Sequence, residues 1–137
     1  GPKPPWKAQT DSMTKIVSTP NCGNSPKMEF LKNFNIAFAK GDLAFLEQSV
    51  TEDIVWNIIG DKKIEGQQQF IVELEKMKEE KTSELILHQV MSHGKEGAVN
   101  GIITTENNQK YAFSDFYVFK GAKGAKIKSI TSYVIQV

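Results

Sequence analysis

The sequence predicts an α+β domain in which helices pack on one face of an antiparallel sheet, and two observations support this prediction. First, the helical patterns come early in the chain, interrupted by one strand, and four long strand patterns follow from residue 82 onward. Second, the spacers between those four strands (HGKEG, ENNQ and GAKGA) are too short for a parallel return, so neighbouring strands must run antiparallel. The expected order is therefore two helices, one strand, a third helix and four strands.

The composition describes a single globular domain. With 137 residues, 39% of them hydrophobic and 24% charged, the chain can bury a core without a disulfide or a structural metal. The net charge is +1 and lysine supplies all of the positive charge, so the basic face and arginine forks of a nucleic-acid-binding protein are missing. No apolar run approaches the roughly 20 residues of a membrane span, and the N-terminus lacks the apolar core of a signal peptide. We therefore expect a cytoplasmic protein without a nucleic-acid or membrane partner.

Residues 1–24 are expected to form an N-terminal extension, and residues 25–137 the single domain. Several prolines and a glycine interrupt the extension, and no apolar period persists in it for more than a few positions. The opening Gly1-Pro2 matches a scar of tag removal, with Met13 as a natural start. The sequence leaves open both this origin and whether the extension is ordered or flexible.

Three helices are indicated by their end signals and apolar stripes. The first has Ser25 as its N-cap, Pro26 in its first turn and Gly41 as its stop. Asp42 can cap a short second helix, and Gly66 opens a third. The apolar stripes of the three helices are Phe30, Leu31, Phe34, Ala37 and Phe38; Leu43, Phe45 and Leu46; and Phe70, Ile71, Leu74 and Met77.

The other segments are rich in β-branched and aromatic residues, which is typical of strands. Residues 51–58 form such a segment between the second and third helices, and a short extended piece through Ile64 follows the Gly60-Asp61 turn. After the third helix the four strand patterns are ELILHQVMSH, AVNGIITTE, KYAFSDFYVFK and KIKSITSYVIQV.

Four stretches of sequence resemble the nuclear transport factor 2-like superfamily, and within it the SnoaL-like and ketosteroid-isomerase-like proteins. They are FNIAFAKGDLAFLEQSVTEDIVWNI, then IEGQQQFIVEL, then YAFSDFYVF followed by KIKSITSYV. Together they cover about residues 28–135. The resemblance implies a cone-shaped fold in which a strongly curved sheet wraps around a helix and leaves a pocket at its open end. It also implies a homodimer that pairs through the sheet.

The resemblance does not extend to the catalytic residues of ketosteroid isomerase. In that branch an aspartate near the end of the first strand moves the proton, while a helix tyrosine and a late-strand aspartate hold the oxyanion. The matching positions here are Ile58, Phe34 and Asp115, respectively. An alkyl side chain cannot abstract a proton and a phenyl ring has no hydroxyl to donate. We therefore do not expect a ketosteroid isomerase that uses the usual mechanism.

Asp115 is the residue on which the functional prediction depends. Strand alternation places it on one face with Tyr111, Phe113, Tyr117 and Phe119. If that face is concave, the carboxyl is partly desolvated and its pKa should rise, which would make it a proton donor or a general base. Three roles stay open for Asp115: a structural hydrogen-bond acceptor, a ligand anchor and an acid–base catalyst.

The expected pocket is aromatic and apolar. Trp56 faces inward from the first strand, with a purely structural role in the core as the alternative. His88 shares a strand face with Ile86 and Val90 and is a weaker catalytic candidate, which could pair with Asp115 or serve only in packing. The predicted pocket residues are Phe34, Phe38, Trp56, Ile58, Phe113, Asp115 and Tyr117.

No cofactor or metal is expected. His88 and His93 belong to no ligand-spaced motif, and the single cysteine, Cys22, has no partner for a disulfide and no nearby histidine to activate it. Three functions stay open. The first is a domain that binds a small hydrophobic ligand. The second is a proton-transfer enzyme of isomerase, cyclase or hydratase type that uses Asp115 with a different base. The third is a non-catalytic dimerisation or interaction module.

Overall fold

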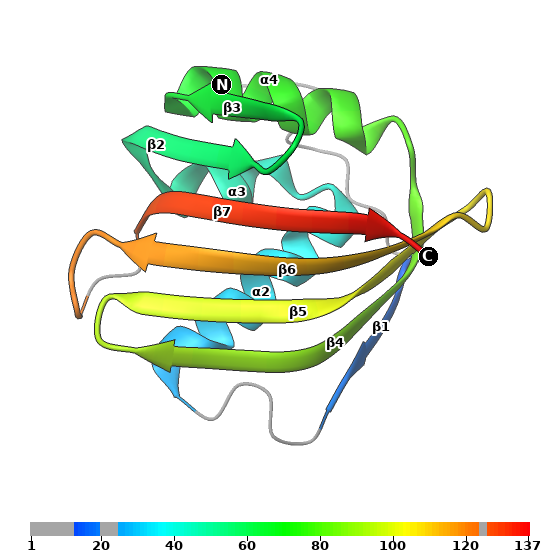
Figure 1. Ribbon diagram of the computed structural model, residues 1–137, viewed down its shortest axis with the longest axis horizontal. Coiled ribbons are helices and arrows are strands. Elements are labelled where there is room, and N and C mark those ends of the chain that lie inside the picture. The colour runs from blue at the N-terminus through cyan, green and yellow to red at the C-terminus, as the bar shows by residue number, and fades with distance from the viewer. Residues whose placement is uncertain (1–12, 20–24, 124–125) are drawn as a thin grey trace, which may run out of the picture.

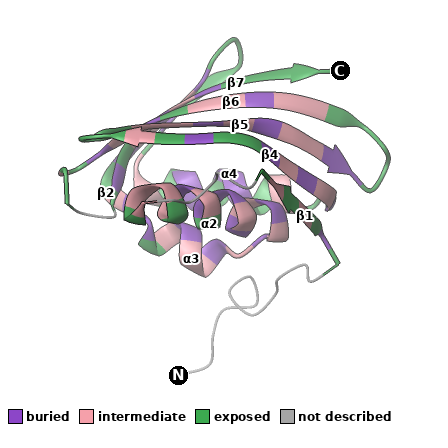
Figure 2. Ribbon diagram, turned by 90° about the horizontal axis from the view of Figure 1, so that it is seen from below, coloured by how far each residue is buried: buried purple, intermediate pink, exposed green. Residues whose placement is uncertain are grey.

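In the computed structural model, which describes residues 13–19, 25–123 and 126–137, a curved seven-stranded sheet wraps around three helices (Figure 1). Figure 2 shows the helices on the concave side of this sheet. The predicted α+β class is therefore confirmed. In chain order the elements are β1 (Lys15–Ser18), α2 (Pro26–Lys40), α3 (Leu43–Gln48), β2 (Val50–Ile58), β3 (Lys62–Glu65), α4 (Gln67–Lys78), β4 (Thr82–His93), β5 (Glu96–Thr105), β6 (Lys110–Phe119) and β7 (Ile127–Gln136).

The helices begin and end where the sequence predicts. The Ser25 hydroxyl accepts a hydrogen bond from the backbone N–H of Met28 (3.2 Å), which caps α2. Gly41 ends α2 in the left-handed region, at φ 72°. Asp42 then accepts from the backbone N–H of Phe45 (3.2 Å) and caps α3. These two caps fix the sharp connection between α2 and α3.

The strand order is β1-β4-β5-β6-β7-β2-β3. The meander from β4 to β7 is antiparallel, as predicted, but β2 pairs with β7 in parallel and β1 pairs with β4 in parallel. The sheet is therefore mixed, and the expectation of a purely antiparallel sheet was wrong. Short spacers constrain only strands that follow one another in the chain, and a helix and four strands separate β2 from β7.

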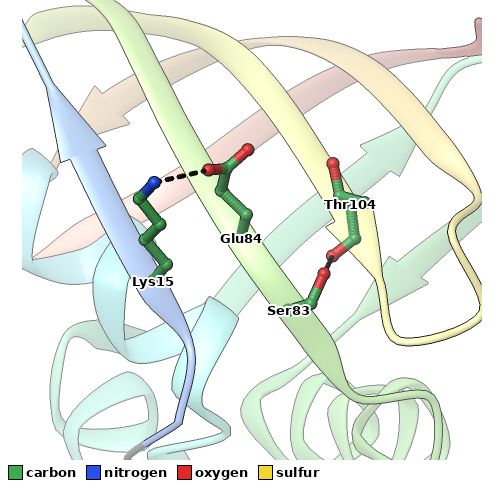
Figure 3. A network of polar contacts seen from close by, with 4 residues as sticks. All are labelled: Lys15, Ser83, Glu84 and Thr104. Carbon is green, nitrogen blue, oxygen red and sulfur yellow. Dashed lines mark hydrogen bonds and ion pairs between the residues drawn. The ribbon is translucent and has the colours of Figure 1, made fainter.

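Strand β1 was not expected, because it lies within residues 1–24. Its residues pair with β4 from Lys15↔Glu84 to Ser18↔Leu87, and the Lys15 ammonium lies 3.6 Å from the Glu84 carboxylate (Figure 3). The strand is four residues long and takes its conformation from this pairing rather than from a local apolar pattern. Cys22, for which no nucleophilic role was expected, lies outside the described residues.

The sheet bends where β4 and β5 approach each other closely. The pairing register of β4 shifts between Leu87 and Gln89, which marks a bulge at His88. Opposite Leu87 lies Gly101, where an added Cβ atom would stand 2.0 Å from the carbonyl oxygen of Ile86. A side chain at position 101 is therefore incompatible with the curvature that shapes the interior of the cone.

One end of the cone is closed by packing around the start of α2. The Lys27 ammonium lies 4.7 Å from the centre of the Phe119 ring and donates a hydrogen bond to the carbonyl of Gly121 (3.0 Å). Phe30 packs edge-on against the same Phe119 ring, with centroids 5.9 Å apart. Side chains therefore fill this end of the interior, and free space is left toward the other end of α2.

Candidate functional site

A cavity of about 860 Å³ lies between α2, α3, α4 and the concave face of the sheet. This volume lies within the usual range of about 300–1,000 Å³ for small-molecule sites. Aromatic and aliphatic side chains make up most of its wall, and Phe34 and Trp56 form part of that wall without filling the space. The seven residues predicted from the sequence all line it: Phe34, Phe38, Trp56, Ile58, Phe113, Asp115 and Tyr117.

Two rigid aromatic pairs shape the wall of the cavity. Phe34 of α2 packs edge-on against Tyr117 of β6, with ring centroids 5.9 Å apart. Trp56 of β2 packs in the same way against Phe70 of α4, at 5.6 Å. Each pair joins a helix to the sheet, so the width of the cavity is set by packed rings rather than by loops.

Asp115 lies in the wall and receives hydrogen bonds from its neighbours. The Tyr117 hydroxyl donates to Asp115 Oδ2 (3.3 Å), and Ser132, which faces Asp115 across the β6–β7 pairing, also donates to it. The indole N–H of Trp56 in turn donates to Ser132 Oγ (2.9 Å). A serine hydroxyl that accepts from Trp56 keeps its own proton for the carboxyl.

The second branch of the network begins at α2. The amide of Asn35 donates to the Tyr117 hydroxyl (3.1 Å) and to the backbone carbonyl of Leu31 (2.9 Å), so both of its protons are used. The Tyr117 oxygen accepts from Asn35 and directs its own proton to Asp115. Each branch therefore ends in a hydroxyl group that donates to the Asp115 carboxyl group.

Burial raises the pKa of the Asp115 carboxyl from its ordinary 3.8 to about 6, because desolvation outweighs the hydrogen bonds from Ser132 and Tyr117, which act in the opposite direction. Burial, together with the nearby Asp115 charge, raises the pKa of the Tyr117 hydroxyl well above 10.0. Tyr117 therefore stays a phenol that donates. Asp115 can exist as carboxyl or carboxylate near neutral pH, which is the property required of a ligand anchor or an acid–base group.

His88 lies away from this site, and the hypothesis that it meets Asp115 was wrong. Its side chain is exposed, and it does not line the cavity. The bulge at His88 resets the strand alternation, so that Leu87 and Val90 are both buried while His88 between them faces outward. Among the described residues, no group of three or more histidine, cysteine, aspartate or glutamate side chains could hold a metal ion.

Sequence reasoning missed Asn35, Ser132 and the lysines at the edge of the cavity. Ser132 alternates with Ile130 and Val134 along β7, and all three line the cavity, so the period of that strand contained the signal. Asn35 follows Phe34 on the inward face of α2. The lysines of α4 carry no signal of a site in the sequence, because their proximity to the cavity follows only from the tertiary structure.

Comparison with known proteins supports the fold through structure alone. No family model matches the sequence, and no curated protein matches it. An NTF2-like protein of unknown function from Cytophaga hutchinsonii is 23% identical, with a TM-score of 0.61, over 78% of this chain and 97% of that one.

Two further solved structures give the same result at lower identity. A protein from Catenulispora acidiphila with a ketosteroid isomerase-like fold, solved with trimethylamine, is 11% identical, with a TM-score of 0.66, over 80% of this chain and 86% of that one. A SnoaL-like family protein from Agrobacterium tumefaciens is 11% identical, with a TM-score of 0.65, over 80% of this chain and 97% of that one. The chain therefore has the NTF2-like fold, as its sequence predicts. In the part that the structure describes, no helix has the length and apolarity to cross a membrane.

Proposed function

We propose that this domain binds a small hydrophobic ligand inside the cone, with Asp115 as the polar anchor. The observation that carries the proposal is a cavity of about 860 Å³ whose aromatic wall contains the hydrogen-bonded carboxyl group of Asp115. A ligand that fills such a space removes a large apolar surface from water, which is the main source of affinity in sites of this kind.

Asp115 can orient a ligand in either protonation state. As the neutral acid it donates one hydrogen bond, which suits a carbonyl oxygen in the ligand. As the carboxylate it accepts, which suits a hydroxyl or amide proton. Its pKa of about 6 makes both forms accessible near neutral pH. A few polar groups in a mostly apolar wall fix the orientation of a ligand, while the apolar contacts supply most of the binding energy.

A direct test is a fluorescence titration with N-phenyl-1-naphthylamine, an uncharged probe that brightens in apolar sites. Ile103 lines the cavity, whereas Ile102 belongs to the opposite face of the same strand, where it pairs with Ile86 and Ala112. We expect Ile103→Trp to lower the probe's affinity by about tenfold, because the indole occupies the space and contact surface of the ligand. Ile102→Trp is the matched control and should leave the affinity unchanged. Equal affinities for the two variants, or no saturable binding by the unmodified protein, would refute the proposal.

Proton transfer is a second candidate function, favoured by the position of Asp115. Its carboxylate lies in a cavity, its pKa is about 6, and it is hydrogen-bonded to a second titratable group, Tyr117. A general base works best when its pKa is near the working pH. In this reaction the Asp115 carboxylate would take a proton from the carbon next to a ligand carbonyl and return it to the resulting enolate.

The test of proton transfer is the exchange of the α-protons of α-tetralone in deuterated buffer, followed by NMR. Catalysis predicts exchange above the buffer rate that Asp115→Asn abolishes with no loss of thermal stability. Exchange at the buffer rate in the unmodified protein would exclude this activity for such ketones. A simultaneous fall in melting temperature in Asp115→Asn would instead identify the carboxyl as structural.

We also propose a homodimer that pairs through the outer face of the sheet. Met91, Phe116 and Tyr133 are each about half exposed there, and the rings of Phe116 and Tyr133 pack edge-on, 6.1 Å apart. Exposed aromatic side chains of this kind are enriched at protein interfaces. Light scattering should give twice the monomer mass for the unmodified protein and the monomer mass for Phe116→Lys. A monomer at high protein concentration would contradict the proposal.

A further inference from the structure

Four lysines line the edge of the cavity, where the C-terminal ends of two helices meet. Lys40 is the last residue of α2, Lys76 and Lys78 lie in the last turn of α4, and Lys81 follows α4 before β4 begins. Glu80 is the one acidic residue among the lining residues of this region. The mouth of the cavity, defined by these lysines, therefore carries a local excess of positive charge although the whole chain has a net charge of only +1.

Three of these four lysines, Lys40, Lys76 and Lys81, have no carboxylate within ion-pair distance among the described residues. Lys78 interacts with the charges of Asp42 and Glu75, while partial burial lowers its pKa.

The lysines also complement the negative ends of the two helix dipoles, each equivalent to roughly half a charge. That role does not account for all four. The two helix ends present about one negative charge in total and Glu80 adds another, whereas the four lysines carry four positive charges. Lys81 also lies beyond the end of α4.

From this arrangement we infer that the ligand is an amphipathic anion, whose apolar body fills the cone and whose anionic group stays at the mouth among Lys40, Lys76, Lys78 and Lys81. The inference rests on the proposed binding function and adds the charge class of the ligand. Asp115 sets the orientation, because its carboxylate, deeper among buried residues, disfavours an anion that enters head first. Lysine carries its charge as a compact ammonium group rather than a planar fork, so a carboxylate and a sulfonate are accepted alike.

The inference is tested with pairs of probes that differ only in charge. 1-Anilinonaphthalene-8-sulfonate has the same ring system as N-phenyl-1-naphthylamine and adds a sulfonate. Decanoate and 1-decanol, used as competitors, make the same comparison for a carboxylate. We expect each anion to bind at least about tenfold more tightly than its neutral counterpart at low salt, and this advantage to shrink in about 0.5 M NaCl, where the Debye length falls to a few ångströms.

The double variant Lys40→Gln/Lys81→Gln should weaken binding of the sulfonate probe by about tenfold, as expected for losing two charge contacts near the surface, and binding of the neutral probe by less than about twofold. Lys63→Gln/Lys128→Gln removes two exposed lysines that do not line the cavity and serves as the charge-matched control. If the mouth lysines only stabilise helix ends, Lys40→Gln/Lys81→Gln will lower the melting temperature and weaken both probes equally, which would overturn the inference.

The same titrations separate a failure of the inference from a failure of the proposed function. If the neutral probe binds in the cavity but the anions have no advantage, the charge class is wrong and the binding function stands. If neither probe responds to Ile103→Trp, the cavity is not the binding site and both proposals fall. A preference for decanoate without one for the sulfonate probe would contradict the statement that the two head groups are accepted alike.

Discussion

Asp115→Asn replaces an ionisable group whose pKa the fold raises, so its main effect should appear in how stability depends on pH. The pKa of Asp115 rises from 3.8 to about 6 on folding, so between these values the folded protein binds a proton that the unfolded chain releases. The contribution of Asp115 to stability is therefore fully present below about pH 4 and is lost as the pH rises through about 6. In full it amounts to about 3 kcal/mol, of which about 2 kcal/mol falls between pH 4 and pH 8.

The assay is urea unfolding of both proteins, followed by tryptophan fluorescence, at a series of pH values. The difference in unfolding free energy between the two cancels the contributions of all other carboxyl groups. We expect the unfolding free energy of Asp115→Asn to rise by about 2 kcal/mol relative to that of the unmodified protein between pH 4 and pH 8. Asp53→Asn, which replaces an exposed carboxyl of β2, is the control. Its unfolding free energy should change with pH in parallel with that of the unmodified protein. If the unfolding free energy of Asp115→Asn also changes with pH in parallel with that of the unmodified protein, the view that the cavity wall desolvates this carboxyl is refuted.

Three further substitutions test the network and the sheet. Ser132→Ala should cost about 1–3 kcal/mol in urea unfolding, because it leaves the buried indole N–H of Trp56 without its acceptor. Tyr117→Phe removes a donor to the carboxyl, so an NMR titration of the Asp115 Cγ should give a pKa above about 6; an unchanged or lower value would contradict the assigned hydrogen bond. Gly101→Ala should lower the melting temperature strongly or prevent folding, because its Cβ would stand 2.0 Å from a backbone oxygen, whereas Gly121→Ala meets nothing within 4 Å and should be neutral.

Much of the fold could be predicted because its signals are local. The helix ends depend on caps such as Ser25, Gly41 and Asp42, which act within one turn of the chain. The meander follows from short spacers that allow only antiparallel neighbours. Strand β1 and the parallel pairing of β2 with β7 could not be predicted in this way, because each depends on which distant strand lies alongside.

In the candidate site, too, the features with a local signal could be predicted from the sequence, and those that depend on distant strands and helices could not. The position of Asp115 on an aromatic strand face, and the direction of its pKa shift, follow from simple alternation along β6. Alternation failed for His88 because a bulge in β4 turned the side chain outward, and a bulge depends on the register with β5. The donors Ser132 and Asn35, and the lysines of the mouth, come from other elements and converge only in the folded chain.

The central claim is that the cone interior is a ligand site, and the most direct test is to locate a bound probe by NMR. With N-phenyl-1-naphthylamine at saturation, we expect nuclear Overhauser effects between its ring protons and the methyl groups of Leu43, Ile103 and Ile130, which line the cavity. Contacts only with the methyl groups of Ile102 and Ile135, which belong to the outer face of the sheet, would contradict the claim. So would the absence of any contact at saturation.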